Sequence, residues 1–307
     1  MHDRGHLLTE QRNPSSADLD RISIAEAFDV MNAADACIAQ AVADARPAIC
    51  EAIERVVAAF RAGGRLFYIG AGTSGRLGVL DVSECPPTFL SDPECVQGII
   101  AGGREAMFRS IEGAEDDPDA GAAEMNERDV GPNDVVIGIA TGGTTPYVHG
   151  ALRCAARRGA GTVFLACVSP EQVPDEADVS IRVLTGPEVI TGSTRLKAGL
   201  ATKMVLNAIS TISMTRVGKV YGNLMVDVNA GACTKLTDRA VRILTHLTHL
   251  DRTTARSLLD RADGRVKTAL VMHHRNVHAA EANRLLAAHA GRVRAVLELP
   301  RPAKNGP

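Results

Sequence analysis

The stretch RLFYIGAGTSGRLGVLDVSECPPTF, residues 65–89, decides the fold of this chain. Its apolar run Leu66–Ile69 stops at Gly70 and Gly72, and two hydroxyl residues and a further glycine lead into a second apolar run. This order predicts a strand, a tight turn and a helix. The free backbone N–H groups in the first turn of such a helix point at one spot, where the helix dipole favours negative charge. The turn therefore predicts a site for a phosphate or a carboxylate.

Two kinds of ligand compete for this turn. With Gly75 the glycines match G-x-G-x-x-G, the fingerprint of dinucleotide sites, which also needs an acidic residue at the end of the next strand. Here the acidic residues come before the next strand-like run, and that run ends in Ala-Gly-Gly. The adjacent hydroxyls of Thr73 and Ser74 suit a terminal phosphate with several acceptor oxygens. A phosphomonoester is thus favoured over a nicotinamide or flavin, and a turn that only packs the helix on the strand stays the alternative.

The pattern from residue 65 onward predicts an α/β fold. Apolar strand-like runs alternate with mostly helical segments, which indicates a parallel sheet covered on both faces. The runs are Leu66–Ile69, Val96–Ile100, Asp134–Ala140, Thr162–Cys167 and Val179–Leu184. Glycine- and hydroxyl-rich turns at residues 70–75, 141–146 and 191–194 fall at the ligand-binding ends of such strands. Three converging turns predict a polar cage for a phosphosugar.

Helices are expected on both sides of the sheet region. Ser23 and Glu26 form a capping-box pattern that begins a helix into the mid-forties, and Pro47 begins a second helix that ends at Gly63. Residues 1 to about 20 are polar and turn-rich, which from composition alone predicts a flexible tail.

The last part of the chain is expected to contain only helices. They are predicted at Asp238–Leu250, Thr253–Arg261, Arg265–Val277 and His278–Ala290, with a disordered tail from Pro300. We therefore expect an N-terminal tail with helices over residues 1–60, a sheet domain over 61–230 and a helical subdomain over 231–307.

Composition excludes several partners. The 307 residues carry a formal net charge of −2, no tryptophan and 3% aromatic residues, which gives no footprint for nucleic acid or for a membrane surface. Seven cysteines occur without a C-x-x-C pair, which is typical of buried thiols in a reducing cytosol. No signal peptide or membrane-length apolar run is found, so a soluble, cytoplasmic protein with a small-molecule partner is expected.

A metal site is not expected. His246 with His249, and His274 with His278, have spacings that could share a metal on one helix face. Neither pair has a third ligand nearby, so incidental histidines on amphipathic helices are the preferred interpretation.

Two carboxylates are candidates for acid–base chemistry. Glu84 lies near the end of the helix that follows the glycine turn, where carbonyl dipoles favour a protonated acid. Glu115 lies just before Asp117 and Pro118, which resemble the start of a helix, where a carboxylate stays ionised as a base. Such a pair is usual for acid and base catalysts, although the acidic run around Glu115 also fits a solvated surface with a helix cap.

Long segments of the chain resemble one family, the N-acetylmuramic acid 6-phosphate etherases, which carry a sugar isomerase (SIS) domain. GAGTSGRLGVLDVSECPPTF, residues 70–89, is similar to their hallmark segment almost letter for letter. The other similar segments are TEQRNP (9–14), GAEDD (113–117), EVITGSTRLKAGLATKMVLNAIST (188–211), KVYGNLMVDV (219–228) and ADGRVKTALVM (262–272). The resemblance covers nearly the whole chain, and its TEQRNP segment implies that part of the N-terminal region is ordered.

The resemblance implies a fold, a reaction and roles for residues. The fold would be a parallel-sheet SIS sandwich in a homodimer, and the reaction would cleave the D-lactyl ether by elimination and rehydration without metal or redox cofactor. Glu84 would be the acid and Glu115 the base. The phosphosugar would be held by Gly72, Thr73, Ser74, Thr144, Thr145, Thr191, Ser193 and Thr194, with Glu188 contacting the sugar.

The chain also departs from the family pattern. Where many members carry Ser-Gly-Arg-Thr-Pro, this chain has Gly142-Gly143-Thr144-Thr145-Pro146, so a hydroxyl and a cation are lost. The segment Asn229–Leu236 is changed as well. Two other functions for an SIS fold stay open: a non-catalytic sugar-phosphate sensor, as in glucokinase regulatory proteins, and an aldose–ketose isomerase.

Overall fold

A computed structural model describes residues 4–228, 230–231 and 234–300 of the chain. Contacts divide the chain into two units, one of residues 1–83 and 93–211 and the other of residues 84–92 and 212–307. The three-part division expected from the sequence stays a prediction.

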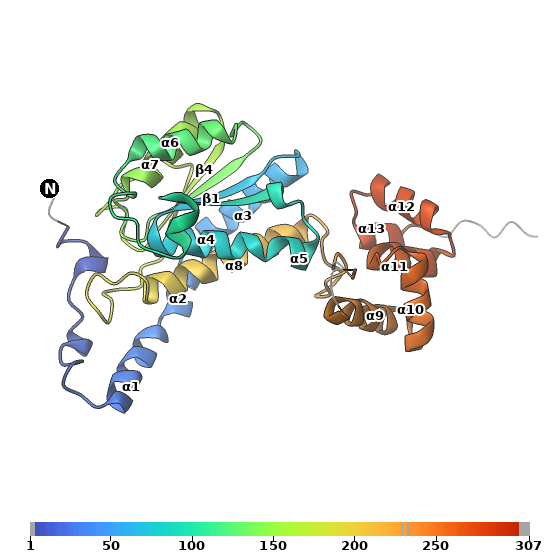
Figure 1. Cartoon of the computed structure of the whole chain (residues 1–307), viewed down its shortest axis with the longest axis horizontal. Coiled ribbons are helices and arrows are strands. Elements are labelled where there is room, and N and C mark those ends of the chain that lie inside the picture. Colours follow the sequence, from blue (N-terminus) through green and yellow to red (C-terminus); the bar gives the residue numbers. More distant parts are fainter. Residues whose placement is uncertain (1–3, 229, 232–233, 301–307) are drawn as a thin grey trace, which may run out of the picture. The chain divides into compact units, whose positions relative to one another are not determined.

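The first unit is built on a five-stranded parallel sheet with strand order β2-β1-β3-β4-β5 (Figure 1). The strands are β1 (Leu66–Gly70), β2 (Val96–Ile100), β3 (Val135–Ile139), β4 (Gly161–Ala166) and β5 (Val179–Arg182). All five agree with the predicted runs to within two residues at each end, which confirms the α/β class. Because β1 lies inside the order, the chain turns one way to β2 and the other way to β3, and the turn after β1 lies at the switch point where ligands of such sheets bind.

Helices cover both faces of this sheet. The helix α4 (Gly72–Ser83) packs on β1 and β2, and α7 (Pro146–Arg157) packs on β3 and β4. Right-handed crossovers in opposite directions put these two helices on opposite faces. The remaining helices of this unit are α1 (Ile24–Asp35), α2 (Ile38–Asp44), α3 (Arg46–Arg61), α6 (Pro118–Glu127) and most of α8 (Lys197–Arg216).

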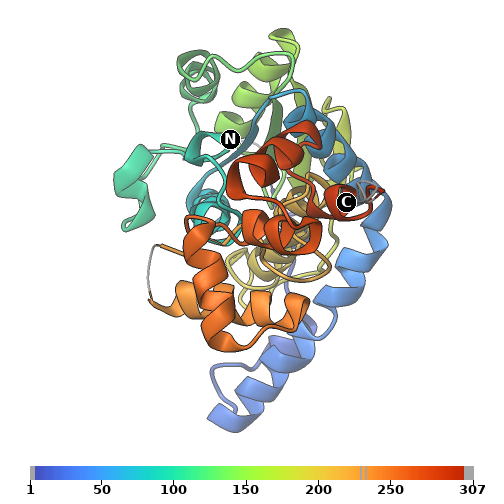
Figure 2. The same cartoon turned by 90° about the vertical axis from the view of Figure 1, so that its right-hand side faces the viewer.

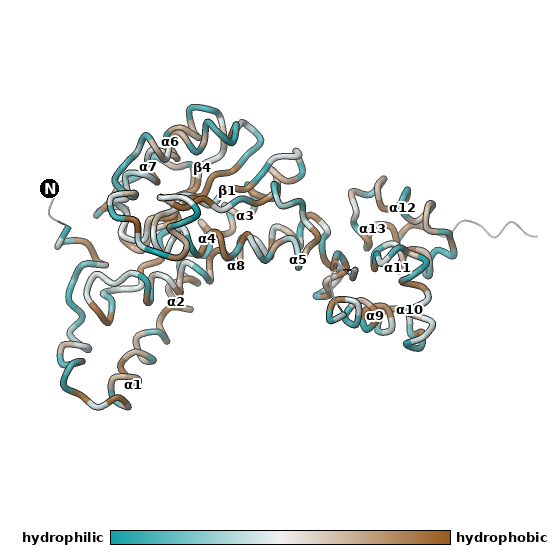
Figure 3. Tube along the Cα trace, in the orientation of Figure 1, coloured by the Kyte–Doolittle hydropathy of each residue, from teal (hydrophilic) through white to brown (hydrophobic). Residues whose placement is uncertain are grey.

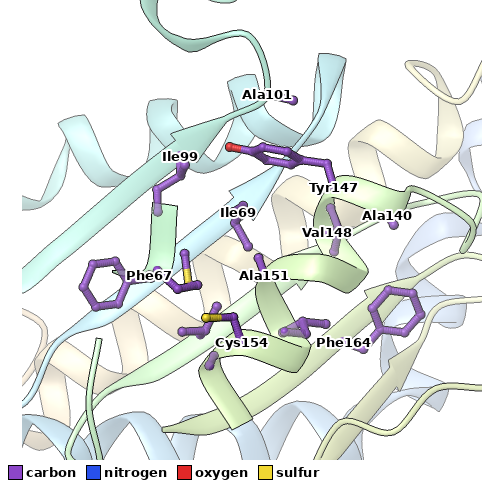
Figure 4. Packing of buried hydrophobic residues seen from close by; sticks show 14 of the residues in the cluster. Phe67, Ile69, Ile99, Ala101, Ala140, Tyr147, Val148, Ala151, Cys154 and Phe164 are labelled. Carbon is purple, nitrogen blue, oxygen red and sulfur yellow. The ribbon is translucent and has the colours of Figure 1, made fainter. Parts of the chain in front are cut away.

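The core lies between the strands and these helices. Figure 3 shows the hydrophobic trace along β1 and β4, and Figure 4 shows Phe67 and Ile69 of β1 in one cluster of buried side chains with Tyr147 and Val148 of α7. These four side chains are at most 2% exposed. Such dense burial of apolar surface makes the sheet a rigid support for the turns at its edge.

The N-terminal region differs from the composition-based expectation. Residues 4–20 contain two short 3-10 helices, Leu8–Glu10 and Pro14–Ser16, so the expected flexible tail is wrong there. Ser23 caps α1 in the predicted capping box with Glu26. The helix then ends at Asp35, and a separate helix α2 follows, where one continuous helix was expected.

The second unit is helical and has its own apolar core. Its helices are α5 (Cys85–Phe89), α9 (Thr234–Thr248), α10 (Arg252–Arg261), α11 (Val266–Arg275), α12 (Ala279–Ala288) and α13 (Val293–Leu297), together with the end of α8. The pair α10–α11 repeats as α12–α13, because each pair begins at a capping side chain and turns through a left-handed residue followed by glycine: Asp251 and Asp263-Gly264, then His278 and Ala290-Gly291. The predicted tail after Pro300 lies outside the described residues.

No helix in the described ranges is long and apolar enough to cross a membrane.

Candidate functional site

The first turn of the site joins β1 to α4 and leaves the helix N-terminus open. A Cβ on Gly70 would lie 2.8 Å from the backbone nitrogen of Gly75, and a Cβ on Gly75 would lie 2.6 Å from Cγ1 of Ile100. Only glycine therefore lets α4 start so close to the sheet. Gly72 has a φ of +53°, a left-handed conformation that glycine adopts at little cost. The following residues, Thr73 and Ser74, stand in the first turn of α4, where backbone N–H groups have no helical partner.

The second turn follows β3 and begins α7. Gly143 has a φ of +81°, and its carbonyl lies 2.7 Å from Nε2 of His149, which ties the turn to α7. Thr145 occupies the N-cap of α7, but its side chain makes no capping hydrogen bond. Its hydroxyl is therefore not used to cap the helix.

The third turn precedes α8 and is fixed from below by Glu188. This side chain is fully buried, and its carboxylate accepts hydrogen bonds from the backbone nitrogens of Lys197 (3.0 Å) and Ala198 (2.9 Å). The Lys197 ammonium donates to the carbonyl of Thr185 at 2.7 Å. Glu188 thus anchors the start of α8, and this geometry supports a structural role for it and no direct contact with a sugar.

A pocket of about 250 Å³, which we call the turn pocket, collects the three turns at one place. Its hydroxyl-bearing lining residues are Thr73, Ser74, Thr141, Thr144, Thr145 and Thr194, and Gly72, Gly142 and Gly192 supply backbone. Of the binding residues predicted from the sequence, Thr191, Ser193 and Glu188 do not line it. The convergence of hydroxyls and one open helix N-terminus suits an anion with several acceptor oxygens.

An N-terminal arm, residues 4–16, contributes to the turn pocket through Arg4, Leu7 and Glu10. Leu7 is 2% exposed and belongs to the sheet core. Gln172 binds the arm by donating to the carbonyl of His6 at 2.8 Å. Glu10 lies against the third turn, since its Oε2 would be 2.9 Å from a Cβ on Gly192.

Sequence reasoning missed Arg4 and Glu10 as lining residues. The resemblance of the TEQRNP segment, residues 9–14, was the signal that could have found Glu10, whereas Arg4 lies outside that segment. Arg4 is the one cation among the residues that line the turn pocket in the described part of the chain.

The two predicted catalytic glutamates are placed differently. Glu115 lines the turn pocket, held by a loop whose backbone accepts a 3.1 Å hydrogen bond from Tyr147 N and which ends at the Asp117 cap of α6. Glu84 is exposed, stands at the N-cap of α5 and does not line this pocket. The twelve residues of α4 rise about 18 Å along the helix axis, and Glu84 follows the last of them.

A second cavity of about 160 Å³, the side pocket, adjoins the turn pocket and shares Ala71, Gly72 and Glu115 with it. Arg76 of α4 fixes its wall, because Nε donates to the carbonyl of Met107 at 3.2 Å and Nη2 to that of Arg109 at 3.0 Å. Glu115 therefore stands where two cavities meet.

Below the third turn, burial and then the charge of Glu188 raise the pKa of the Cys167 thiol to about 12. This cysteine stays a neutral thiol at physiological pH and is fully buried, so it packs as a small apolar residue.

Metal ligands do not gather among the described residues: no group of three or more His, Cys, Asp or Glu side chains there could hold an ion. His278 uses its Nδ1 to accept a hydrogen bond from the backbone of Glu281 and so caps α12. That role accounts for one of the histidines that the spacing had singled out.

The sheet with its three turns defines a class of protein, the SIS-domain proteins. The family model of the glucokinase regulatory protein N-terminal SIS domain matches residues 48–156, and that of the SIS domain matches residues 116–212. Among solved structures, a phosphoheptose isomerase from Francisella tularensis is similar with a TM-score of 0.41 and 16% identity, covering 60% of this chain and 98% of that one.

Within this class the chain belongs to the N-acetylmuramic acid 6-phosphate etherase family. It is 56% identical over 298 residues to the N-acetylmuramic acid 6-phosphate etherase of Crocosphaera subtropica, with 97% of each chain covered. The enzyme of the same name from Gloeobacter violaceus is 57% identical over 298 residues, again with 97% of each chain covered. That of Synechococcus elongatus is 58% identical over 297 residues, covering 97% of this chain and 96% of the relative.

Proposed function

We propose that this chain cleaves the lactyl ether of N-acetylmuramic acid 6-phosphate and releases N-acetylglucosamine 6-phosphate and D-lactate. The observation that carries the proposal is the 56–58% identity, over nearly the whole chain, to enzymes with that name. The turn pocket supports it, since it joins an anion-binding turn to a carboxylate, Glu115, in one cavity.

The chemistry that these residues support is an elimination followed by hydration. In the open-chain sugar the carbon 2 proton is acidified by the neighbouring aldehyde, and Glu115 removes it. The carbon 3–oxygen bond then breaks, its electron pair leaves with the lactate oxygen, and Glu84 supplies the proton that this oxygen needs. Water adds across the new double bond, with hydroxyl at carbon 3 and a proton at carbon 2, so one water is consumed for each ether cleaved.

The phosphate is proposed to lie in the turn pocket. Backbone N–H groups at the start of α4, the hydroxyls of Thr73, Ser74 and Thr194, and those of Thr144 and Thr145 would bind its oxygens. Many members of the family carry an arginine where this chain has Thr144, and Arg4 would supply the positive charge that is missing at that position.

Glu84 is proposed to act in the site of a second copy of the chain. It does not line the pocket of its own chain and follows a helix that leads about 18 Å away from the turn. We infer that the acid for the reaction comes from a second copy of the chain, and a cytoplasmic homodimer is the simplest such assembly.

Helix α1 supports a homodimer independently. It has no buried residue, although Ile24, Phe28 and Met31 form an apolar stripe with exposed fractions of 91%, 66% and 39%. Figures 1 and 2 both show α1 extending away from the sheet. A 12-residue helix on its own is only marginally stable in water. We therefore infer that this apolar stripe packs against a partner surface. The exposed Leu80 of α4 and Leu200 and Met204 of α8 offer apolar surface of the same kind.

The test is to incubate the purified chain with N-acetylmuramic acid 6-phosphate and to measure D-lactate. Lactate is expected with and without a chelator, and none is expected from N-acetylmuramic acid that lacks the phosphate. Formation of a ketose phosphate without lactate would favour an isomerase. Tight binding of the phosphosugar with no product would favour a sensor.

A further inference from the structure

We propose that the side pocket binds the carboxylate of the substrate's lactyl group through Arg109, and that this contact selects substrates whose ether carries an acid. The inference rests on the proposed function. It concerns the lactyl carboxylate, the second charged group of the substrate, because the turn pocket is proposed to bind only the phosphate.

The arrangement of the two cavities matches the order of groups along the substrate. The phosphate sits at carbon 6, the proton to be removed at carbon 2 and the lactyl ether at carbon 3. The turn pocket offers the open start of α4, and Glu115 lies in the wall that both cavities share. A sugar with its phosphate in the turn pocket and carbon 2 at Glu115 would direct its carbon 3 substituent into the side pocket.

The side pocket has the size and lining for a lactyl group. Its volume of about 160 Å³ leaves room for a group of six heavy atoms, and Ala101, Ala106 and Ile111 offer apolar contact for the lactyl methyl. Its polar lining consists of Arg76, Arg109 and Ser110 together with the carboxylates of Glu112 and the shared Glu115.

Arg109 is the available cation of this cavity. Arg76 is half-buried and spends Nε and Nη2 on the carbonyls of Met107 and Arg109, so it shapes the loop. The Arg109 guanidinium is exposed, and within the described residues it has no hydrogen bond or ion pair. A guanidinium binds a carboxylate by two parallel hydrogen bonds, which adds orientation as well as affinity.

This contact would also serve the reaction. Holding the carboxylate fixes the ether oxygen that must leave, so carbon 3 stays aligned while Glu115 acts at carbon 2. A phosphosugar without the lactyl group would fill only the turn pocket and would gain nothing from Arg109.

The experiment compares two ligands that differ only in that charge: N-acetylmuramic acid 6-phosphate and its derivative with the lactyl carboxylate converted to an amide. Dissociation constants are measured by calorimetry in a Glu115→Gln background, which prevents turnover. In that background Arg109→Gln should weaken binding of the acid about 10- to 100-fold and binding of the amide by less than about threefold. Arg109→Lys should recover part of the loss for the acid.

Arg104→Gln is the matched control, because Arg104 is exposed on the same loop and lines neither pocket. It should leave both dissociation constants unchanged. Equal weakening of acid and amide by Arg109→Gln, or no weakening of either, would overturn the inference. Lactate release by the unaltered chain is measured separately, so a failure of the proposed function is seen apart from a failure at Arg109.

Discussion

At the scale of single residues, Ser74 tests whether the turn after β1 holds the phosphate. Its side chain is 7% exposed and lines the turn pocket. Ser74→Ala removes one hydrogen bond to a charged group, which costs about 1.5–3 kcal/mol, so affinity for N-acetylglucosamine 6-phosphate should fall roughly 10- to 100-fold. Ser83→Ala, at the exposed far end of the same helix, is the control. Unchanged affinity in Ser74→Ala would move the phosphate elsewhere.

Glu115 and Glu84 can be separated by the step that each serves. Glu115→Gln cannot take the carbon 2 proton, so it should show neither lactate release nor exchange of that proton with deuterated solvent. Glu84→Gln should still exchange it but release lactate about 10² to 10⁴ times more slowly, because a general acid is lost. Mass spectrometry of recovered substrate gives the exchange. The opposite pattern would reverse the two roles, and near-normal lactate release by both variants would remove both glutamates from the mechanism.

The sequence predicts site residues best at positions where the backbone conformation restricts the residue type. Spacing predicted the turn at Gly70 and Gly72, where the turn geometry admits few other residues, and the hydroxyl chemistry predicted Ser74. Glu188 shows the limit, because its carboxylate is buried against the start of α8 and a sequence does not say which way a side chain points. Arg4 escaped because a polar N-terminus has no periodicity that would indicate a fixed position.

At the scale of elements, the N-terminal arm acts as a fourth wall of the turn pocket beside the three turns. Leu7 fixes it in the core, which leaves Arg4 and Glu10 over the cavity. Arg4→Gln should raise the KM roughly tenfold, since a charged hydrogen bond to phosphate is lost. Arg12→Gln, exposed on the same arm and outside the pocket, should have no effect. An Arg4→Gln enzyme with the KM of the Arg12→Gln control would exclude the arm from binding.

Arg65 and Asp134, the residues directly before β1 and β3, link the starts of these two strands. Asp134 is 5% exposed, accepts from the backbone of Arg65 at 2.8 Å and pairs with its guanidinium at 2.7 Å. Burial acts to raise the pKa of Asp134, but the hydrogen bonds from Arg65 and Gly131 outweigh it and lower the pKa below its ordinary value. This pair therefore ties the sheet together most strongly when the carboxylate is ionised.

Asp134→Asn should lower the free energy of unfolding by about 3–5 kcal/mol, because it leaves a guanidinium that is two-thirds buried without its charge partner. The sign with pH follows from the lowered pKa. The stabilisation is fully present above the pKa of about 3.9 in the unfolded chain and is lost as the pH falls through the lower folded value. Urea unfolding at pH 7 and pH 3 measures this, and the difference between the two proteins should shrink at pH 3. A constant difference would show that the charge is not responsible.

At the scale of the whole molecule, the sequence predicted the sheet well because a parallel sheet buried on both faces requires continuous apolar strands, as at Val135–Ile139. It predicted the division of α1 from α2 poorly. Residues 24–44 have no strong breaker, and α1 lacks the buried contacts that would fix its ends. The same lack of burial is what points to a second copy of the chain.

A mixture of two inactive variants tests whether the site is shared between copies. If Glu115 of one chain works with Glu84 of another, a hybrid dimer of Glu84→Gln and Glu115→Gln has one site with both glutamates and one site with neither. Random re-association after mild denaturation gives half hybrids, so lactate release should recover to about a quarter of that of the unaltered protein. Sedimentation confirms that dimers have re-formed, and each variant refolded alone is the control. If both glutamates acted within one chain, every site in the mixture would lack one of them, and activity would stay at the level of the separate variants.

Phe28→Asp should lower the lactate release recovered in this mixture, because a charge on the exposed stripe of α1 opposes its packing on a partner.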